Sequence, residues 1–355
     1  MSGTSLDGVD AVVARFDKEK PDLLAHSRVE FDTALHRGLL SLNHKNDNEL
    51  ETAQVLSNEL ARCYANACAK LLQTANLTPR DISAIGCHGQ TVRHRPDLGF
   101  TLQLNNPSLL AELTHISVVA DFRSRDIAAG GQGAPLVPAF HSAVFGDKKI
   151  HRAVVNIGGI SNLTDLPTDG NISGFDCGPG NVLMDAWIQQ HQGVPFDRDG
   201  EWALGGNLKP DLLQKMLAEK YFSLPPPKST GRDLFNLPWL LRFLDNDLQA
   251  RDVQTTLLAL TAQTIVDAIQ RHAAGAKEIF FCGGGARNRT LMQALEAALA
   301  PAKVRKTDDL GIDAEQVEAL AFAWLARQTV NLKTGNVPAV TGARGERILG
   351  GIYPA

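Results

Sequence analysis

The sequence predicts an α/β protein of two domains with a duplicated fold, and three observations support this. The chain has 355 residues, a length that favours two domains over one. Strand-like runs alternate with long helical patterns. The strand, glycine-rich turn and strand of NIGGISNLTDL, residues 156–166, echo the opening GTSLDGVDAVV. Because the two copies lie about half a chain apart, they indicate a duplication.

The composition argues against several classes of protein. Hydrophobic residues make up 44% of the chain, enough for sizeable cores, and the net charge of −4 disfavours nucleic-acid binding. No apolar run is long enough to cross a membrane, and no secretion signal is present. The five cysteines lack metal-ligand spacing, so we expect reduced thiols in a soluble, cytoplasmic protein.

Periodicity predicts the elements in order. Helical spacing of apolar residues predicts long helices over 50–75, 252–272 and 317–330, and shorter ones over 108–114 and 209–219. Strands are predicted over 9–16, 81–86, 100–104, 118–120, 152–156 and 277–282. Residues 17–50 carry mixed strand and loop signals. The tail ends in a short apolar run that could return to the first domain.

Asp176 is the strongest candidate for a catalytic residue. It follows a short apolar run in GFDCGPGNVLMD, residues 174–185, and precedes a Gly-Pro-Gly turn and a helical pattern. A carboxylate at such a corner is held by backbone on both sides, and we expect it to face open space where a reacting molecule could lie.

Three glycine turns are candidates for holding a nucleotide. Gly158 and Gly159 join two strands, and Gly283, Gly284 and Gly285 join a strand to a helix that Asn288 could cap. The opening turn lets backbone N–H groups approach an anion, although an ordinary hairpin tip would look the same. Its candidate residues are Gly3, Thr4, Ser5, Leu6, Asp7, Gly8, Val9 and Asp10. Neither the dinucleotide fingerprint nor the Walker-type loop occurs.

Polar residues beside glycine suggest a ligand site in the first half of the chain. His88 and Gln90 lie at the end of a predicted strand, where a structural histidine is an equal alternative. Arg125 and Gln132 lie in DFRSRDIAAGGQG, residues 121–133, which suits a carboxylate or phosphate ligand better than a surface ion-pair loop.

Two further segments leave their alternatives open. The stretch PPPKSTGR, residues 225–232, could contact phosphate through its cluster of Lys228, Ser229, Thr230 and Arg232, or serve as a rigid connector. Glu318, in the first turn of a predicted helix, is either a favourable acid at a helix N-terminus or a second site carboxylate.

Long motifs along the whole chain resemble the anhydro-N-acetylmuramic acid kinase family. They are MSGTSLDGVD, GCHGQTVRH, DFRSRDIAAGGQGAPLVPAFH, NIGGISNL, GFDCGPGNVLMDAW, PKSTGR, FCGGGARN and VEALAFAWLA. The resemblance implies membership of the actin-like ATPase superfamily: two ribonuclease H-like domains with an interdomain active-site cleft. We expect the N-terminal domain to comprise 1–120 with 341–355, and the C-terminal domain 121–340.

The resemblance also implies a reaction. ATP and water convert 1,6-anhydro-N-acetylmuramic acid into N-acetylmuramic acid 6-phosphate and ADP, in peptidoglycan recycling, and family members are generally homodimers. Asp176 would activate water, and Glu318 would assist it or orient the sugar. The opening turn and Gly158-Gly159 would hold phosphate, the turn at Gly283 to Gly285 adenosine, and Asp7 Mg²⁺. His88, Gln90, Arg125 and Gln132 would bind the sugar, with Arg125 on its lactyl carboxylate.

Two other classes compete with this interpretation. A nucleotide-gated binding protein like the superfamily's chaperones would need a peptide-binding module, for which no sequence is spare. An ordinary sugar kinase would deprotonate a free hydroxyl and incorporate no water.

The family usually carries about one more strand before MSGT, which would anchor the opening turn. We therefore expect that about seven additional upstream codons would raise stability and activity.

Overall fold

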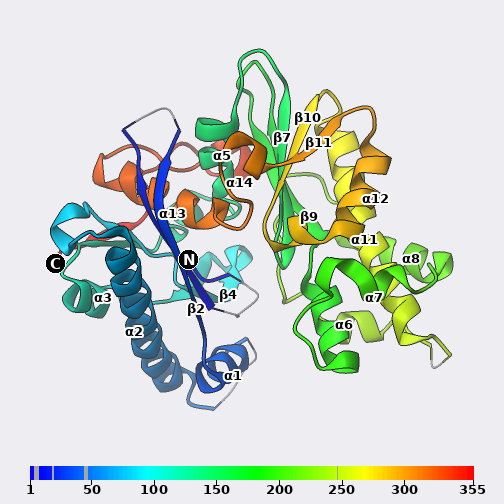
Figure 1. Cartoon of the computed structure of the whole chain (residues 1–355), viewed down its shortest axis with the longest axis horizontal. Coiled ribbons are helices and arrows are strands. Elements are labelled where there is room, and N and C mark those ends of the chain that lie inside the picture. Colours follow the sequence, from blue (N-terminus) through cyan, green and yellow to red (C-terminus); the bar gives the residue numbers. More distant parts are fainter. Residues whose placement is uncertain (4–7, 18–19, 44–46, 246) are drawn as a thin grey trace. The chain divides into compact units, whose positions relative to one another are not determined.

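The computed structural model describes residues 1–3, 8–17, 20–43, 47–245 and 247–355. Contacts divide the chain into two compact units (Figure 1). Unit 1 comprises Met1–Val144 with Glu318–Ala355, and unit 2 comprises Phe145–Val317. These units differ from the predicted domains at 121–144 and 318–340, which were predicted in the C-terminal domain and belong to unit 1. Buried Asp126 shows why, since its carboxylate accepts hydrogen bonds from Asn336 Nδ2 (2.7 Å) and Thr341 Oγ1 (2.8 Å).

The described residues of unit 1 form three small sheets. Strands β1 (Gly8–Arg15) and β2 (Asp22–Glu30) form an antiparallel pair, and β4 (Gln90–Arg95) pairs with β5 (Phe100–Leu104). The third sheet has the order β12-β6-β3, in which β12 (Gly351–Tyr353) is antiparallel to β6 (Val118–Ala120) and β3 (Ile85–Gly86) is parallel to it. The C-terminal apolar run therefore returns to unit 1, as predicted.

Long helix α2 (Glu49–Ala75) forms the main core of unit 1. Its buried face, which includes Leu60, Ala61 and Tyr64, packs against β1, β2 and α3. The other helices of this unit are α1 (Thr33–Ser41), α3 (Pro107–Thr114), α4 (Ser124–Ala128), α5 (Val137–Phe145), α13 (Val317–Val330) and α14 (Pro338–Thr341). Short 3₁₀ turns lie at Pro79–Asp81 and Pro96–Leu98.

Unit 2 is built on a five-stranded mixed sheet with the order β11-β10-β7-β8-β9. Its strands are β7 (Arg152–Ile157), β8 (Ile160–Leu166), β9 (Ser173–Pro179), β10 (Glu278–Cys282) and β11 (Lys303–Lys306). Strands β7, β10 and β11 are parallel, and β8 runs antiparallel to both of its neighbours. Helices α11 (Ala250–His272) and α12 (Arg289–Leu299) lie side by side and pack on the sheet (Figure 1).

The remaining elements of unit 2 are short. They are α6 (Val182–Gln192), α7 (Glu201–Leu204), α8 (Pro210–Leu217), α9 (Lys220–Ser223), α10 (Leu237–Leu241) and the 3₁₀ turns η3 (Arg198–Gly200), η4 (Gly284–Arg287) and η5 (Thr307–Leu310).

The α/β class and the long helices are confirmed, whereas two local predictions are wrong. The strand predicted over 81–86 covers only β3, because Asp81 Oδ2 accepts hydrogen bonds from the N–H and Oγ1 of Thr78 (2.8 Å each) and starts a 3₁₀ turn. Residues 17–50 contain β2 and α1. Every described position of β2 is partly exposed, so its sequence lacks the alternation of a half-buried strand.

Two further observations concern the cysteines and the possibility of membrane-spanning helices. All five cysteines are free. Within the described ranges, no helix is both long and apolar enough to span a membrane.

Acid should destabilise the protein through histidines that the fold keeps neutral, among them buried His141 and half-buried His94. Burial lowers the pKa of His141 to about 3 and that of His94 to about 4, so both are neutral when folded. The unfolded chain binds protons below about pH 6.5, so the stability contributed by each neutral imidazole is present above that pH and lost below it. We expect the free energy of unfolding to fall by about 1.4 kcal/mol per pH unit per histidine between pH 6 and pH 4.

Denaturant unfolding of His141→Asn at several pH values checks this. The variant should lose about 1.4 kcal/mol per pH unit of the slope, whereas His115→Asn, at an exposed histidine, should retain it. An unchanged slope in His141→Asn would contradict the prediction.

Candidate active site

The glycine turns of unit 2 meet at one end of its sheet. The β7–β8 turn contains Gly158 and Gly159, and the turn after β10 contains Gly283. Gly180, just after β9, donates its N–H to Gly159 O (2.9 Å), and Asn181 donates to Gly158 O (2.8 Å). The carboxyl ends of β7 and β10 thus lead into turns at the same edge, the usual position of a ligand site in an α/β sheet.

Asp176 lies in strand β9, directly opposite Asn162 of β8. Its backbone N–H donates to Lys228 O (3.3 Å), and its carboxylate Oδ2 accepts the N–H of Thr230 (3.0 Å). The residue is only 7% exposed. The expectation of an open corner is therefore wrong, because the segment before α10 covers the outer edge of β9.

Tyr221 also contacts Asp176. Its hydroxyl donates a hydrogen bond to the backbone oxygen of Asp176 (2.6 Å). Burial, and then the charge of Asp176, raise the pKa of Tyr221 well above its usual value, so the hydroxyl stays protonated. The backbone N–H, backbone oxygen and side chain of Asp176 are thus all held in place.

Sequence reasoning missed Asn162, Tyr221 and the N–H of Thr230. Residues directly opposite each other on antiparallel strands project from the same face, so Asn162 lies beside Asp176. Asn162 is 9% exposed, and its Oδ1 has no hydrogen-bond partner among the described residues. The motif NIGGISNL contains Asn162, but only the strand register places it next to the acid.

The glycines differ in what the fold requires of them. A Cβ at Gly283 would overlap Asn156 Oδ1, and a Cβ at Gly285 would overlap the side chain of Ile157. By contrast, the nearest atoms to a Cβ at Gly158 or Gly284 would lie 3.5 and 3.9 Å away, which are ordinary contacts. Packing therefore explains two of these glycines and leaves Gly158 and Gly284 without a structural reason.

The opening turn of unit 1 is only partly described, because Thr4, Ser5, Leu6 and Asp7 lie outside the described residues. Around it, Val9 belongs to the core of unit 1, and Asp10 Oδ1 is hydrogen-bonded to His26 Nε2 (3.3 Å). A Cβ at Gly8 would overlap the backbone oxygen of Val29 on the paired strand.

Gln90 links the opening turn to strand β4. Its Nε2 donates to the backbone oxygen of Gly3 (3.1 Å). The residue is 1% exposed, and its Oε1 is buried without a partner among the described residues. A buried unpaired oxygen is costly, so Gln90 Oε1 is a candidate acceptor for a ligand.

His88 is held by protein groups at both ring nitrogens. Its Nδ1 donates to Gly89 O (2.7 Å), so its Nε2 accepts from Nε and Nη2 of Arg123 (3.1 and 2.9 Å). Burial and Arg123 hold the pKa of His88 well below its usual range, so the ring is neutral. Arg123 also donates to Gly133 O (2.7 Å), so the pair fixes the glycine-rich loop at 130–133.

Comparison with known proteins decides the family. A sequence profile described as anhydro-N-acetylmuramic acid kinase matches residues 1–355. A protein of that name from Nitrosomonas europaea is 53% identical, with 100% of this chain and 98% of the relative covered, and one from Bordetella pertussis is 55% identical, with 100% and 95% covered. The chain belongs to the anhydro-N-acetylmuramic acid kinase family.

Membership of the anhydro-N-acetylmuramic acid kinase family means that the chain is an enzyme, a kinase. The family name supports ATP and a sugar as its substrates. Among solved structures, the activator of 2-hydroxyisocaproyl-CoA dehydratase from Clostridium difficile with bound ADPNP is 12% identical at a TM-score of 0.42, with 90% of this chain and 93% of that chain covered.

The other residues predicted from the family resemblance lie in unit 1. Arg125 is exposed on α4, and Gln132 donates its backbone N–H to Thr341 O (2.7 Å). Glu318 is half-buried in the first turn of α13. The roles of these residues toward substrate stay predictions.

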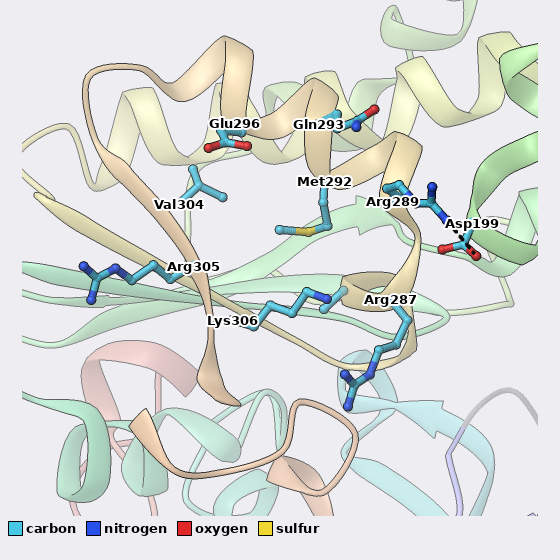
Figure 2. Close-up of a pocket in the computed structure, with 10 residues that line it drawn as sticks. Asp199, Arg287, Arg289, Met292, Gln293, Glu296, Val304, Arg305 and Lys306 are labelled. Carbon is cyan, nitrogen blue, oxygen red and sulfur yellow. Dashed lines mark ion pairs between the residues drawn. The ribbon is translucent and has the colours of Figure 1, made fainter. Parts of the chain in front are cut away.

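A groove of about 340 Å³ adjoins the turn that contains Gly283, Gly284 and Gly285 (Figure 2). Apolar Met292 and Val304 line it together with Arg287, Arg289 and Lys306. Asn288 caps α12 beside it, accepting the N–H of Leu291 (3.0 Å), as predicted. Arg289 is paired with Asp199 (3.6 Å), and Arg287 with Asp313 (2.7 Å).

Proposed function

We propose that this kinase opens 1,6-anhydro-N-acetylmuramic acid with water and phosphorylates O6 with ATP. The products are N-acetylmuramic acid 6-phosphate and ADP, and the pathway is the recycling of peptidoglycan fragments by a cytoplasmic homodimer. The observation that carries this proposal is the position of Asp176. Asp176, whose carboxylate accepts the N–H of Thr230 and whose backbone is bonded by Lys228 and Tyr221, lies on the strand that leads into the joined glycine turns of unit 2.

The chemistry couples two steps through one oxygen. Asp176 takes a proton from water as the water oxygen bonds to the anomeric carbon. The bond from that carbon to O6 breaks, and O6 keeps the electron pair and attacks the γ-phosphorus of ATP. Asn162 Oδ1, which lies beside Asp176, would accept the second hydrogen of the same water.

Backbone groups would hold the nucleotide. Gly158 and Gly284 have room for a Cβ, so a ligand against the bare backbone would explain glycine at both positions. The opening turn would hold phosphate, and the groove beside Gly284 the adenosine end. Gln90 Oε1 would accept from the sugar, and His88, Arg125, Gln132 and Glu318 would complete the sugar site.

Mg²⁺ would neutralise charge on the transferring phosphates, which themselves supply most of its ligands. Asp7, the carboxylate proposed for it, lies outside the described residues. Asp10 Oδ1 is already bonded by His26, so this residue fits the ion only in part.

A coupled assay with the anhydro sugar and ATP, run in ¹⁸O-water, tests the proposal. We expect ADP release that depends on the anhydro sugar, and label at the anomeric oxygen of the product before mutarotation exchanges it. Turnover without label would instead favour an ordinary sugar kinase that acts on a free hydroxyl.

A further inference from the structure

The segment from Tyr221 to Thr230, here called the strap, binds the outer edge of strand β9. The sheet ends at β9, so backbone groups on its outer side face no further strand. Asp176 donates its N–H to Lys228 O in the strap, and Thr230 returns its N–H to Asp176 Oδ2. The strap therefore bonds the edge strand at Asp176, through both its backbone and its carboxylate.

Lys228 closes the strap on itself. Its Nζ donates to the backbone oxygen of Tyr221 (3.1 Å) and lies 3.5 Å from that of Phe222, both in the short helix α9. The same ammonium lies 4.7 Å from the ring centre of Tyr221 and 5.5 Å from that of Phe175. These contacts direct the ammonium of Lys228 toward the start of the strap. They therefore favour the interpretation of residues 225–232 as a rigid connector over a role in binding phosphate.

The ring of Phe222, in the strap, packs against Gly178 of strand β9. The ring of Phe222 lies where a side chain at residue 178 would begin, since a Cβ on Gly178 would be 2.7 Å from Phe222 Cε1. Phe222 also stacks on Phe235, with ring centres 5.5 Å apart and planes inclined by 20°. The start of the strap is thus held by the packing of Phe222, and the ammonium of Lys228 ties the later part of the strap to this start.

We propose that Lys228 is a positioning residue, which holds the strap so that the N–H of Thr230 keeps the carboxylate of Asp176 in its productive orientation. This rests on the proposed role of Asp176 as the base. Without the ammonium, the backbone oxygens of Tyr221 and Phe222 each lose one donor, although Tyr221 O keeps the N–H of Leu224, and the segment from Lys228 to Thr230 can shift. Catalytic groups tolerate displacements of only about 0.5 Å, so a small shift is enough to slow the reaction.

The variant Lys228→Met tests the proposal, because it keeps most of the stem and removes the charge. We expect kcat to fall at least about tenfold while KM for ATP stays within about twofold. An N–H donor favours an ionised carboxylate, so the acid limb of the kcat profile should also move to higher pH. Lys228→Arg should restore most of kcat, since a guanidinium can donate to both carbonyls and lie over the rings.

Two more variants complete the test. Tyr221→Phe removes only the hydroxyl that bonds the backbone of Asp176, and it should lower kcat in the same way even where Lys228→Met unfolds. Lys220→Met, at an exposed lysine of the same helix, should behave as the wild type.

Each contrary result has a distinct meaning. Wild-type kcat in folded Lys228→Met would overturn the positioning role, whatever the result for Tyr221→Phe, and so would a raised KM for ATP with unchanged kcat, which would mark a phosphate contact. Full turnover in Asp176→Asn would instead remove the base itself. If Asp176→Asn is inactive while the strap variants are unaffected, only the inference about Lys228 fails.

Discussion

Asp176→Asn should reduce kcat by about a thousandfold or more while ATP still binds. Loss of a general base costs about 10²–10⁴ in rate, and a thousandfold loss corresponds to about 4 kcal/mol of transition-state stabilisation. The amide keeps an oxygen that can accept the N–H of Thr230, and the backbone contacts to Lys228 and Tyr221 are unchanged. The variant should therefore fold like the wild type and fail only in proton transfer.

Steady-state turnover of the anhydro sugar, together with calorimetric titration of ATP, separates these effects. Asp169→Asn is a matched control, because Asp169 lies in the exposed turn between β8 and β9 and bonds only Asn171 among the contacts shown. It should keep kcat within about twofold. Turnover near the wild-type level in Asp176→Asn would exclude this residue as the base.

Gly158→Ala and Gly284→Ala should each raise KM for ATP at least about tenfold without lowering the melting temperature. The protein leaves room for a methyl group at both positions, with the nearest atoms 3.5 and 3.9 Å away. Only a ligand lying against the backbone would meet the added atom. A tenfold change corresponds to about 1.4 kcal/mol of lost binding. Initial rates at varied ATP and thermal unfolding of the same samples check both halves of the prediction.

Gly180→Ala provides the contrast. A Cβ at this position would overlap the backbone oxygen of Gly158, so the change should break the contact between two turns and lower the melting temperature by several degrees. If Gly158→Ala and Gly284→Ala bind ATP normally, the nucleotide does not lie against these turns.

Local signals predicted much of the fold. Helix α2 and helix α11 were predicted to within about two residues at each end, because an amphipathic face repeats along more than twenty residues. Strand β2 and helix α1 were not resolved, since β2 is partly exposed along its described length and α1 buries only Leu35 and Leu39. Short elements with weak patterns depend on the partners that pack on them.

For the candidate site, the sequence selected residues but not their contacts. The motifs identified the family, which the comparisons confirm, and they selected Asp176 and the glycine turns. They did not indicate that Arg123 donates a hydrogen bond to His88. Nor did they indicate that the Asp126 carboxylate bonds both Gly133 and Thr341, and so joins residues 126–133 to the C-terminal segment. Both contacts join residues far apart along the chain.

By itself, the sequence determined the α/β class, the family and the kinase activity, and it selected Asp176 as the candidate base. These follow from motifs and periodicities that each occupy a short stretch of chain. Only the tertiary structure decided which glycines the packing requires, that Asn162 lies beside Asp176, and that the strap bonds its carboxylate. The physical reason is distance along the chain: Thr230 and Asp176 are 54 residues apart, and their hydrogen bond exists only after β9 has joined the sheet and the strap has closed over its edge.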